Sequence, residues 1–290
     1  MAIFDLLATS PAAFIAVLGA FGLLVGSFLN VVIHRLPIML EREWRRDCLV
    51  LLTPEAVLPA EERYNLATPR SCCPRCGAAI RAIDNVPILS WLALRGRCRH
   101  CRAPIAARYP AIEAAAGAMG ALVAWRYGFG IAAPLAAVMA WCLLALAVID
   151  YDTMLLPDSL TLPLLWLGLA ANLFGVFVPL ETAVIGAMAG YLALWLVYWA
   201  FKLATGKEGM GFGDFKLLAA IGAWLGWPVL PSVILGAAGV GAVLGLAMIA
   251  LRDHARSKPI PFGPYLAAAG FLCLVWGDFV SGLLTRGGGL

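Results

Sequence analysis

The sequence predicts an all-α polytopic membrane protein with about eight transmembrane helices and one small, cysteine-rich cytoplasmic lobe between helices 1 and 2. Hydrophobic residues make up 62% of the 290 residues and charged residues only 13%, whereas a soluble domain is nearer about a quarter charged. Apolar runs of about 18 or more residues recur along the chain, and each can cross a bilayer as a helix. A soluble protein with an unusually large core does not fit this pattern.

The first predicted span runs from about Pro11 to Ile33. The only charge before it is Asp5, so it does not resemble a cleavable signal, which begins with a basic region. Gly and Pro interrupt the region 215–251, which can form two spans or one span with a re-entrant piece. The further apolar segments are at about 111–127, 129–149, 159–179, 183–201, 215–230, 231–251 and 262–284.

A polar block separates the first apolar segment from the second. Residues 35–109 hold 13 of the 21 Lys and Arg residues against 7 acidic residues, and six of the eight cysteines. We therefore expect three parts, which are a first transmembrane helix over 1–34, a basic cysteine-rich lobe over 35–109 and a membrane domain over 110–290.

The positive charges predict the orientation, because Lys and Arg favour cytoplasmic loops. If the lobe is cytoplasmic and eight spans alternate, 19 of the 21 Lys and Arg residues lie on or beside the cytoplasmic face, and only Arg126 and Arg286 lie outside. The loops 150–158, 202–214 and 252–261 then also face the cytoplasm.

The lobe contains two Cys-x-x-Cys pairs separated by 21 residues, made by Cys73, Cys76, Cys98 and Cys101. Two residues between cysteines let both sulfurs reach one tetrahedral ion, so the pairs predict a structural four-thiolate zinc site. Disulfides or redox pairs are the alternative, and they fit a reducing cytoplasm less well. Cys72 and His100 are competing ligands.

Two aspartates lie where an apolar run meets a polar loop on the same predicted side. Asp150 closes the third span and Asp214 opens the sixth, 64 positions later (214 minus 150). An acid at the border of a membrane is costly and indicates function, and two carboxylates that share a proton are what an aspartic protease needs. Helix capping is the ordinary alternative for Asp214 and Asp158, and residues alone do not separate Asp150 from Asp158 as the first acid.

Four blocks in this order carry a specific resemblance. They are Gly26 to Pro37, the double Cys-x-x-Cys lobe, Ile149-Asp150 with Leu156-Pro157-Asp158, and Gly211-Phe212-Gly213-Asp214-Phe215-Lys216. From about residue 20 to 285 the chain resembles the bacterial type IV prepilin leader peptidase family. Members of that family are inner-membrane aspartic proteases of the Gly-x-Gly-Asp kind. They cut the basic leader from prepilins and pilin-like secretion proteins, and many methylate the new amine with S-adenosylmethionine.

The resemblance implies a role for particular residues. The two catalytic acids fall on Asp150 and Asp214, with the active site at the cytoplasmic face of the inner membrane. The zinc cysteines of the family fall on Cys73, Cys76, Cys98 and Cys101. The glycine linked to methyl transfer falls on Gly96, which makes the lobe the methyltransferase part. Glu113, inside an apolar run near the lobe, is a candidate to bind the amine or the sulfonium, and pairing with Arg108 is the alternative.

The expected partners are prepilins and pilin-like proteins as substrates and membrane lipids, with headgroups facing the basic lobe; no nucleic acid is expected. A proton-coupled transporter is the alternative function, because intramembrane acids and broken helices suit transport. Against it, the carboxylates sit at one face and no repeat is evident. A zinc-dependent assembly protein is a second alternative, in which changes to the aspartates would be silent.

Overall fold

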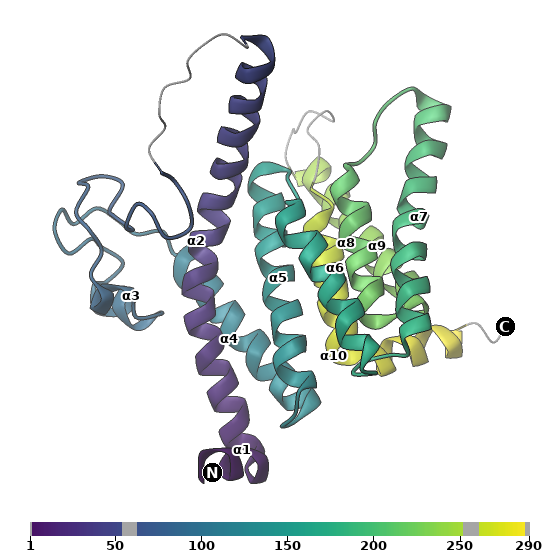
Figure 1. The fold of residues 1–290 in the computed structure, drawn as a ribbon, viewed down its shortest axis with the longest axis horizontal. Helices are drawn as coiled ribbons and strands as arrows, with labels where there is room; N and C mark the ends of the chain where they lie inside the picture. The colour runs from purple at the N-terminus through teal and green to yellow at the C-terminus, as the bar shows by residue number, and fades with distance from the viewer. Residues whose placement is uncertain (1, 54–62, 252–260, 288–290) are drawn as a thin grey trace. The chain divides into compact units, whose positions relative to one another are not determined.

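The computed structural model describes residues 2–53, 63–251 and 261–287 (Figure 1). These residues form helices and two isolated bridges but no strand, which confirms the all-α class. The chain divides into two compact units, Met1–Trp125 and Arg126–Leu290. Three of the cations behind the predicted orientation lie outside the described residues: Arg252, Arg256 and Lys258.

The first unit is built on one long helix. Its helical elements are α1 (Ala2–Thr9), α2 (Pro11–Leu52), η1 (Ala82–Asn85), α3 (Leu89–Ala93) and α4 (Arg108–Tyr127). The Ser10 hydroxyl caps α2 by accepting a hydrogen bond from the N–H of Ala13 at 3.3 Å, as N-cap serines do. The helix continues through Pro37 to Leu52, well beyond the expected end of the first span.

Small residues let α2 and α4 pack backbone against backbone. A side chain added at Gly22 would lie 2.5 Å from the carbonyl oxygen of Ala116, and one added at Gly26 would lie 2.6 Å from the Cα of Glu113. The later α2 position meets the earlier α4 position, so the two helices run antiparallel. Close contacts between small residues are the usual way in which helices associate in membranes.

The loops of the first unit are tied to α2 by a buried arginine. Arg35 donates to the carbonyl oxygen of Asn65 at 2.8 Å and to that of Pro69 at 2.6 Å. Each cysteine pair sits in a tight turn that a short backbone bridge closes. The turn with Cys73 and Cys76 is closed by a bridge between Cys72 and Ala79. The corresponding bridge in the other turn joins Arg97 and Pro104. The loops of the lobe are therefore short-range structures with little core of their own.

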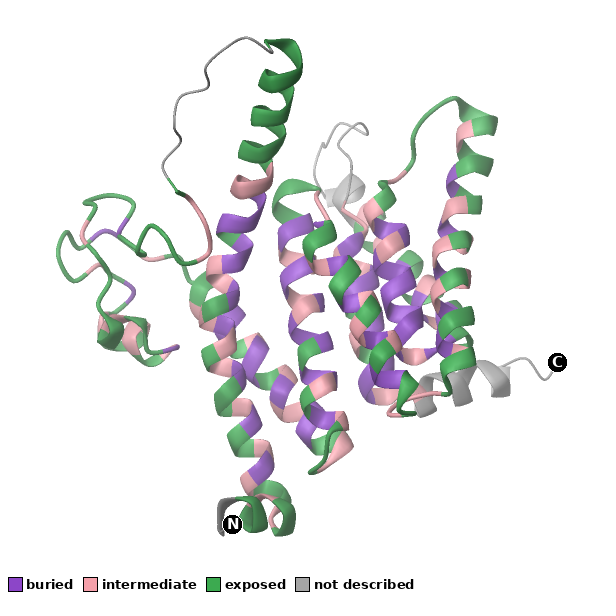
Figure 2. Cartoon of the chain, in the orientation of Figure 1, coloured by how far each residue is buried: buried purple, intermediate pink, exposed green. Residues whose placement is uncertain are grey.

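The second unit is a helix bundle around α8. Its elements are α5 (Ala132–Thr153), α6 (Asp158–Leu173), α7 (Leu180–Thr205), α8 (Phe212–Leu225), η2 (Trp227–Val229), α9 (Leu230–Leu251) and α10 (Gly263–Gly287). Ten of the 14 residues of α8 are buried, and α6, α7 and α10 all contact it. Figure 2 shows that α5 and α8 carry many of the buried positions of this unit.

The contact between α7 and α8 depends on two facing glycines. A side chain added at Gly186 would lie 2.3 Å from the carbonyl oxygen of Gly222, and one added at Gly222 would lie 2.2 Å from that of Gly186. No larger residue fits at either position unless the helices separate. This contact fixes the last part of α8 against α7, about two turns after Asp214.

Among the described residues, four helical segments are long and apolar enough to cross a membrane. They are Pro11–Leu52, Ala132–Thr153, Leu180–Thr205 and Trp227–Leu246. With 16 and 14 residues, α6 and α8 reach about 24 and 21 Å at 1.5 Å per residue, less than the roughly 30 Å of a hydrocarbon core. The expected eight spans are therefore not confirmed, although the region 215–251 does form two separate helices, α8 and α9.

Candidate active site and metal centre

Asp150 lies in the last turn of α5 and is buried. Its Oδ2 accepts a hydrogen bond from the backbone N–H of Gly263 at 2.9 Å. Gly263 is the first residue of α10, where the amides of a helix are unpaired and favour negative charge. A side chain added at Gly263 would lie 2.7 Å from the same Oδ2. The glycine thus both donates to the carboxylate and leaves room for it.

Asp214 lies in the first turn of α8 and is also buried. Within the part of the chain that the structure describes, its Oδ1 is buried and has no hydrogen-bond partner. Buried polar atoms are nearly always paired, and an exception is often explained by a catalytic role. The second glycine of Gly-x-Gly-Asp, Gly213, packs against Leu156. A side chain added at Gly213 would lie 2.7 Å from the Cβ of Leu156, which leaves no room for a larger residue.

The two buried carboxylates lie close enough to repel each other electrostatically. In the second unit, α5 ends where α8 and α10 begin, and α10 contacts both of these helices. The structure therefore brings Asp150 and Asp214 together, as the sequence predicts. Gly263 was not predicted, and its only sequence signal is the Pro261-Phe262-Gly263-Pro264 run before an apolar segment.

Asp158 has a different environment from the buried pair. Both of its oxygens accept from the Nζ of Lys216 at 2.7 Å, and its side chain is 54% exposed. This ion pair ties the start of α6 to the first turn of α8. The contact favours Asp150 over Asp158 as the partner of Asp214, and it gives Lys216 a partner that the sequence did not indicate. Asp152 is exposed.

The four predicted zinc ligands converge in the first unit. The sulfurs of Cys73, Cys76, Cys98 and Cys101 all lie within 4.8 Å of one another, and those of Cys73 and Cys101 are 3.8 Å apart. Zn–S bonds of about 2.3 Å in a tetrahedron place sulfurs about 3.8 Å apart. The four residues therefore fit a zinc ion, and neither Cys72 nor His100 belongs to the cluster.

Backbone amides prepare two of these sulfurs for a cation. Hydrogen bonds from the backbone of Arg75 and then Cys76 lower the pKa of Cys73 to about 6. The backbone of Cys101 and then His100 lowers the pKa of Cys98 in the same way. A thiolate is the form of cysteine that binds metal, so the turns themselves favour the liganding state.

Gly96 is buried between the short helix α3 and the second cysteine turn. Its N–H donates to the carbonyl oxygen of Trp91 at 2.8 Å, and its own carbonyl accepts from Ile105 at 2.7 Å. The residue has φ +65°, and a side chain added there would lie 2.9 Å from the ring of Trp91. These contacts support the cysteine turn, and the predicted contact with a methyl donor stays a prediction.

Glu113 lies in α4 and is buried. Its Oε2 accepts a hydrogen bond from the N–H of Ile88 at 2.7 Å, which ties the residue before α3 to α4. Part of its hydrogen-bonding capacity therefore serves the attachment of the lobe. The predicted binding of an amine or a sulfonium also stays a prediction.

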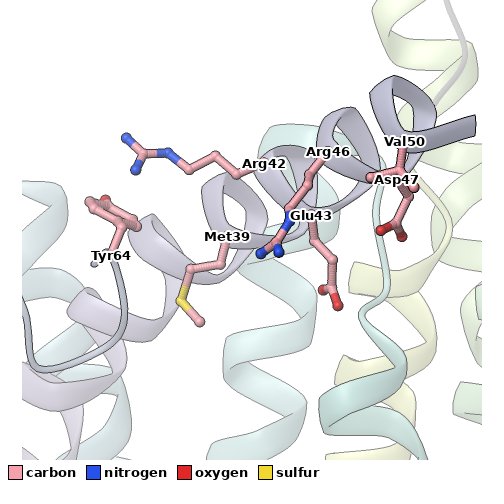
Figure 3. A pocket seen from close by; sticks show the side chains of 7 residues that line it. All are labelled: Met39, Arg42, Glu43, Arg46, Asp47, Val50 and Tyr64. Atoms are coloured by element: carbon pink, nitrogen blue, oxygen red, sulfur yellow. The ribbon is translucent and has the colours of Figure 1, made fainter. Parts of the chain in front are cut away.

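A pocket of about 470 Å³ lies in the last part of α2 (Figure 3). Its walls carry two arginines and two acids, and the guanidinium of Arg42 lies 4.3 Å from the centre of the Tyr64 ring. It contains none of the predicted site residues, and mixed charge is typical of a solvated helix face. The lining residues are Met39, Arg42, Glu43, Arg46, Asp47, Val50 and Tyr64.

The fold and the site define a helical membrane protein with a buried carboxylate pair and a cysteine cluster. Comparison with known proteins shows the family to which it belongs. Residues 20–127 match the model of the Bacterial Peptidase A24 N-terminal domain, and residues 137–246 match that of the Type IV leader peptidase family. The chain therefore belongs to the type IV leader peptidase family. No solved structure matches it significantly.

Curated relatives resemble the chain over almost its whole length. The prepilin leader peptidase/N-methyltransferase of Aeromonas salmonicida is 57% identical over 272 residues, 93% of this chain and 94% of that one. The protein of the same name from Stutzerimonas stutzeri is 55% identical over 277 residues, 96% of each chain. That from Pseudomonas aeruginosa is 53% identical over 281 residues, 97% of each.

Proposed function

We propose that this chain is a membrane aspartic endopeptidase that removes the leader peptide of type IV prepilins and pilin-like secretion proteins, and that it methylates the new N-terminal amine. The observation that carries the peptidase proposal is the buried pair, Asp150 and Asp214, with an unpaired oxygen on Asp214. Family membership and the name shared by the relatives support both activities. Nothing in the structure or the comparisons supports the transporter alternative.

In the proposed mechanism, Asp150 and Asp214 divide the proton transfers between them. Like charges this close do not both ionise, so the pair holds one proton. The ionised carboxylate removes a proton from water, whose oxygen then attacks the scissile carbonyl carbon. The protonated carboxylic acid donates its proton to the nitrogen as the C–N bond breaks. Acid–base catalysis of this kind contributes about 10²–10⁴-fold.

Gly263 keeps one oxygen of Asp150 occupied, so that the other faces the reaction. Its N–H holds Oδ2 at 2.9 Å, which leaves Oδ1 of Asp150 for the water. On Asp214, the unpaired Oδ1 is the oxygen that we assign to the peptide bond.

We also infer the membrane arrangement. The eight longest helices, α2 and α4 to α10, each cross the membrane once, and the shorter ones are matched by local thinning of the bilayer. The lobe over 35–109 then faces the cytoplasm between the helix of 1–34 and the peptidase domain of 110–290. This arrangement places the ends of α5 and α8 that carry the aspartates on the cytoplasmic side of the inner membrane, where a leader peptide would lie.

The lobe would carry the structural zinc ion and the methyl-transfer function. S-adenosylmethionine would supply the methyl group. The contacts of Gly96 and Glu113 are internal to the first unit, and they favour a supporting role for both residues. The basic surface of the lobe would face lipid headgroups, because a basic leader would be repelled by it.

The proposal is tested by identifying the product. The purified full chain and a full-length prepilin are placed in the same lipid vesicles, with and without S-adenosylmethionine, and the products are analysed by mass spectrometry. We expect one cut between leader and mature pilin in both samples, and a further methyl group on the new amine only when the methyl donor is present. An uncut prepilin in vesicles that contain folded, zinc-loaded protein would contradict the peptidase proposal.

A further inference from the structure

The cysteine lobe carries an exposed apolar surface that the zinc site does not use. Four residues at a spacing of three form it, and we name them the α3 patch: Ile83 (70% exposed), Val86 (39%), Leu89 (66%) and Leu92 (57%). The turn η1, which holds the first of them, contacts α3, and both elements are largely exposed in Figure 2. Single exposed apolar residues are ordinary, but a continuous patch marks a surface that is covered by something.

Two contacts set the level of this patch along α2. The N–H of Ile88, just before α3, donates to Glu113 at 2.7 Å, and Glu113 packs directly on Gly26. Gly26 lies seven residues before Ile33 (33 minus 26), which is about 10 Å below the end of the apolar run of α2. A glutamate side chain reaches about one helical turn of 5.4 Å. The start of α3 therefore lies level with the apolar part of α2.

A second hydrogen bond gives the same register. The side-chain amide of Asn30 donates to the carbonyl oxygen of Tyr109 at 3.2 Å, so the polar start of α4 meets α2 one turn above Gly26. The contact to Ile88 lies between these two levels. In Figure 1, α3 accordingly lies beside the lower half of α2 and not beside its upper end.

The charges around the α3 patch suit a membrane surface. Arg81 precedes it and Arg95 and Arg97 follow it, and all three are exposed. Arginines can extend to anionic headgroups while neighbouring apolar residues enter the acyl layer. The one acid in this stretch, Asp84, accepts from the Nε of Arg99 at 2.9 Å, so it adds no unpaired negative charge.

The patch is also held in a fixed orientation. The indole N–H of Trp91, in the middle of α3, donates to the carbonyl oxygen of Ile105 at 3.1 Å. The same ring packs against Gly96. One side of α3 is thereby fixed to the second cysteine turn, which leaves Leu89 and Leu92 on the outer side.

We propose that the α3 patch is inserted into the leaflet on the lobe side of the membrane, at the boundary between headgroups and acyl chains. The lobe is then a monotopic surface domain that touches lipid through α3, and not a soluble domain held only by its two flanking helices. The partner is a lipid surface with anionic headgroups. The proposal rests on α2 crossing the membrane and does not depend on the peptidase activity.

Photocrosslinking in vesicles of phosphatidylethanolamine and phosphatidylglycerol tests this proposal. Two variants of the full chain are compared, Leu92→p-benzoylphenylalanine and Leu51→p-benzoylphenylalanine. Leu51 is a matched control, because it is also a leucine of an exposed helix face and is 79% exposed. It lies 18 residues after Ile33 (51 minus 33), about 27 Å along the helix beyond the apolar run. Lipid adducts are counted by mass spectrometry of the peptides.

We expect at least about tenfold more lipid adduct at position 92 than at position 51, as the preference of a buried leucine for an apolar environment implies. Zinc content equal to that of the unmodified chain shows that the lobe is folded in both variants. Crosslinks from position 92 only to a second copy or to a prepilin would overturn the proposal. So would equal lipid adduct at both positions, or none at position 92 in zinc-loaded protein. Leu89→p-benzoylphenylalanine repeats the test if the first variant lacks zinc.

Discussion

The cysteine lobe and the aspartate pair hold their functional side chains in opposite ways. Within residues 63–107 only four residues are buried: Cys73, Pro87, Gly96 and Ala103. The aspartates instead sit at the ends of helices in a bundle whose central helix has ten of 14 residues buried. We therefore expect the lobe to depend on a metal ion for its order, and the aspartate pair to depend on helix packing. Small domains with little core commonly need such an ion.

Removal of one zinc ligand should have the largest effect on structure. We expect Cys98→Ser to lose the metal and the protease resistance of the lobe, because structural zinc contributes about 10–16 kcal/mol to the folding of small domains. Cleavage of prepilin should change only a few-fold if the two regions are independent. Metal analysis and limited proteolysis measure the effect. Cys72→Ser, outside the cluster, is the control, and full metal content in Cys98→Ser would contradict the assignment.

A methyl group added between α7 and α8 should have the next largest effect on stability. It tests whether the helix bundle that carries the aspartates depends on close packing. Gly222→Ala places a Cβ 2.2 Å from the carbonyl oxygen of Gly186, and overpacking of this kind typically costs about 1–3 kcal/mol. Thermal unfolding in detergent should show the loss, with zinc content unchanged. Gly239→Ala meets no atom within 4 Å and should unfold like the unmodified chain. Equal destabilisation by both would argue against close helix packing.

A smaller change at the aspartate pair should affect catalysis more than folding. Gly263→Ala brings a Cβ to 2.7 Å from Oδ2 of Asp150, and displacement of a catalytic group by about 1 Å can lower a rate about 100-fold. We expect kcat for prepilin cleavage to fall about 10–100-fold with little change in KM. Gly236→Ala, whose Cβ makes an ordinary 3.6 Å contact, is the control. An unchanged kcat in Gly263→Ala would contradict the assignment of Gly263 as a residue that positions Asp150.

The ion pair between Asp158 and Lys216 should matter least. Its side chains are 54% and 29% exposed, and pairs near the surface contribute about 0–1 kcal/mol. Lys216→Met should therefore unfold within a few degrees of the unmodified chain and cleave prepilin within a few-fold of its rate. A loss of cleavage as large as that expected for Gly263→Ala would contradict this expectation and show that Lys216 acts on the aspartate pair.

Features carried by local patterns were predictable from the sequence. The helical class follows from apolar runs, and the convergence of the four cysteines follows from the spacing within each pair. Contacts between distant segments were not predictable. Gly263 is 113 residues from Asp150, and Lys216 is 58 from Asp158, so no local pattern records either contact.

Two further differences have physical causes. The helix α2 passes through Pro37 and continues to Leu52, although proline usually ends a helix because it lacks an N–H. The basic composition of 35–109 concealed the α3 patch, since the four apolar residues of the patch change the average of the whole block little. The level of that patch became visible through two hydrogen bonds, Ile88 to Glu113 and Asn30 to Tyr109.

The most direct test of the account is single-turnover cleavage of a prepilin in vesicles by Asp150→Asn, Asp214→Asn and Asp158→Asn, each checked for folding by thermal unfolding and for zinc content. The buried pair predicts that the first two variants lose cleavage by about 10²-fold or more, while Asp158→Asn stays within a few-fold of the unmodified chain. Folded Asp158→Asn that does not cut, or folded Asp150→Asn and Asp214→Asn that both do, would contradict the central claim that Asp150 and Asp214 are the catalytic pair.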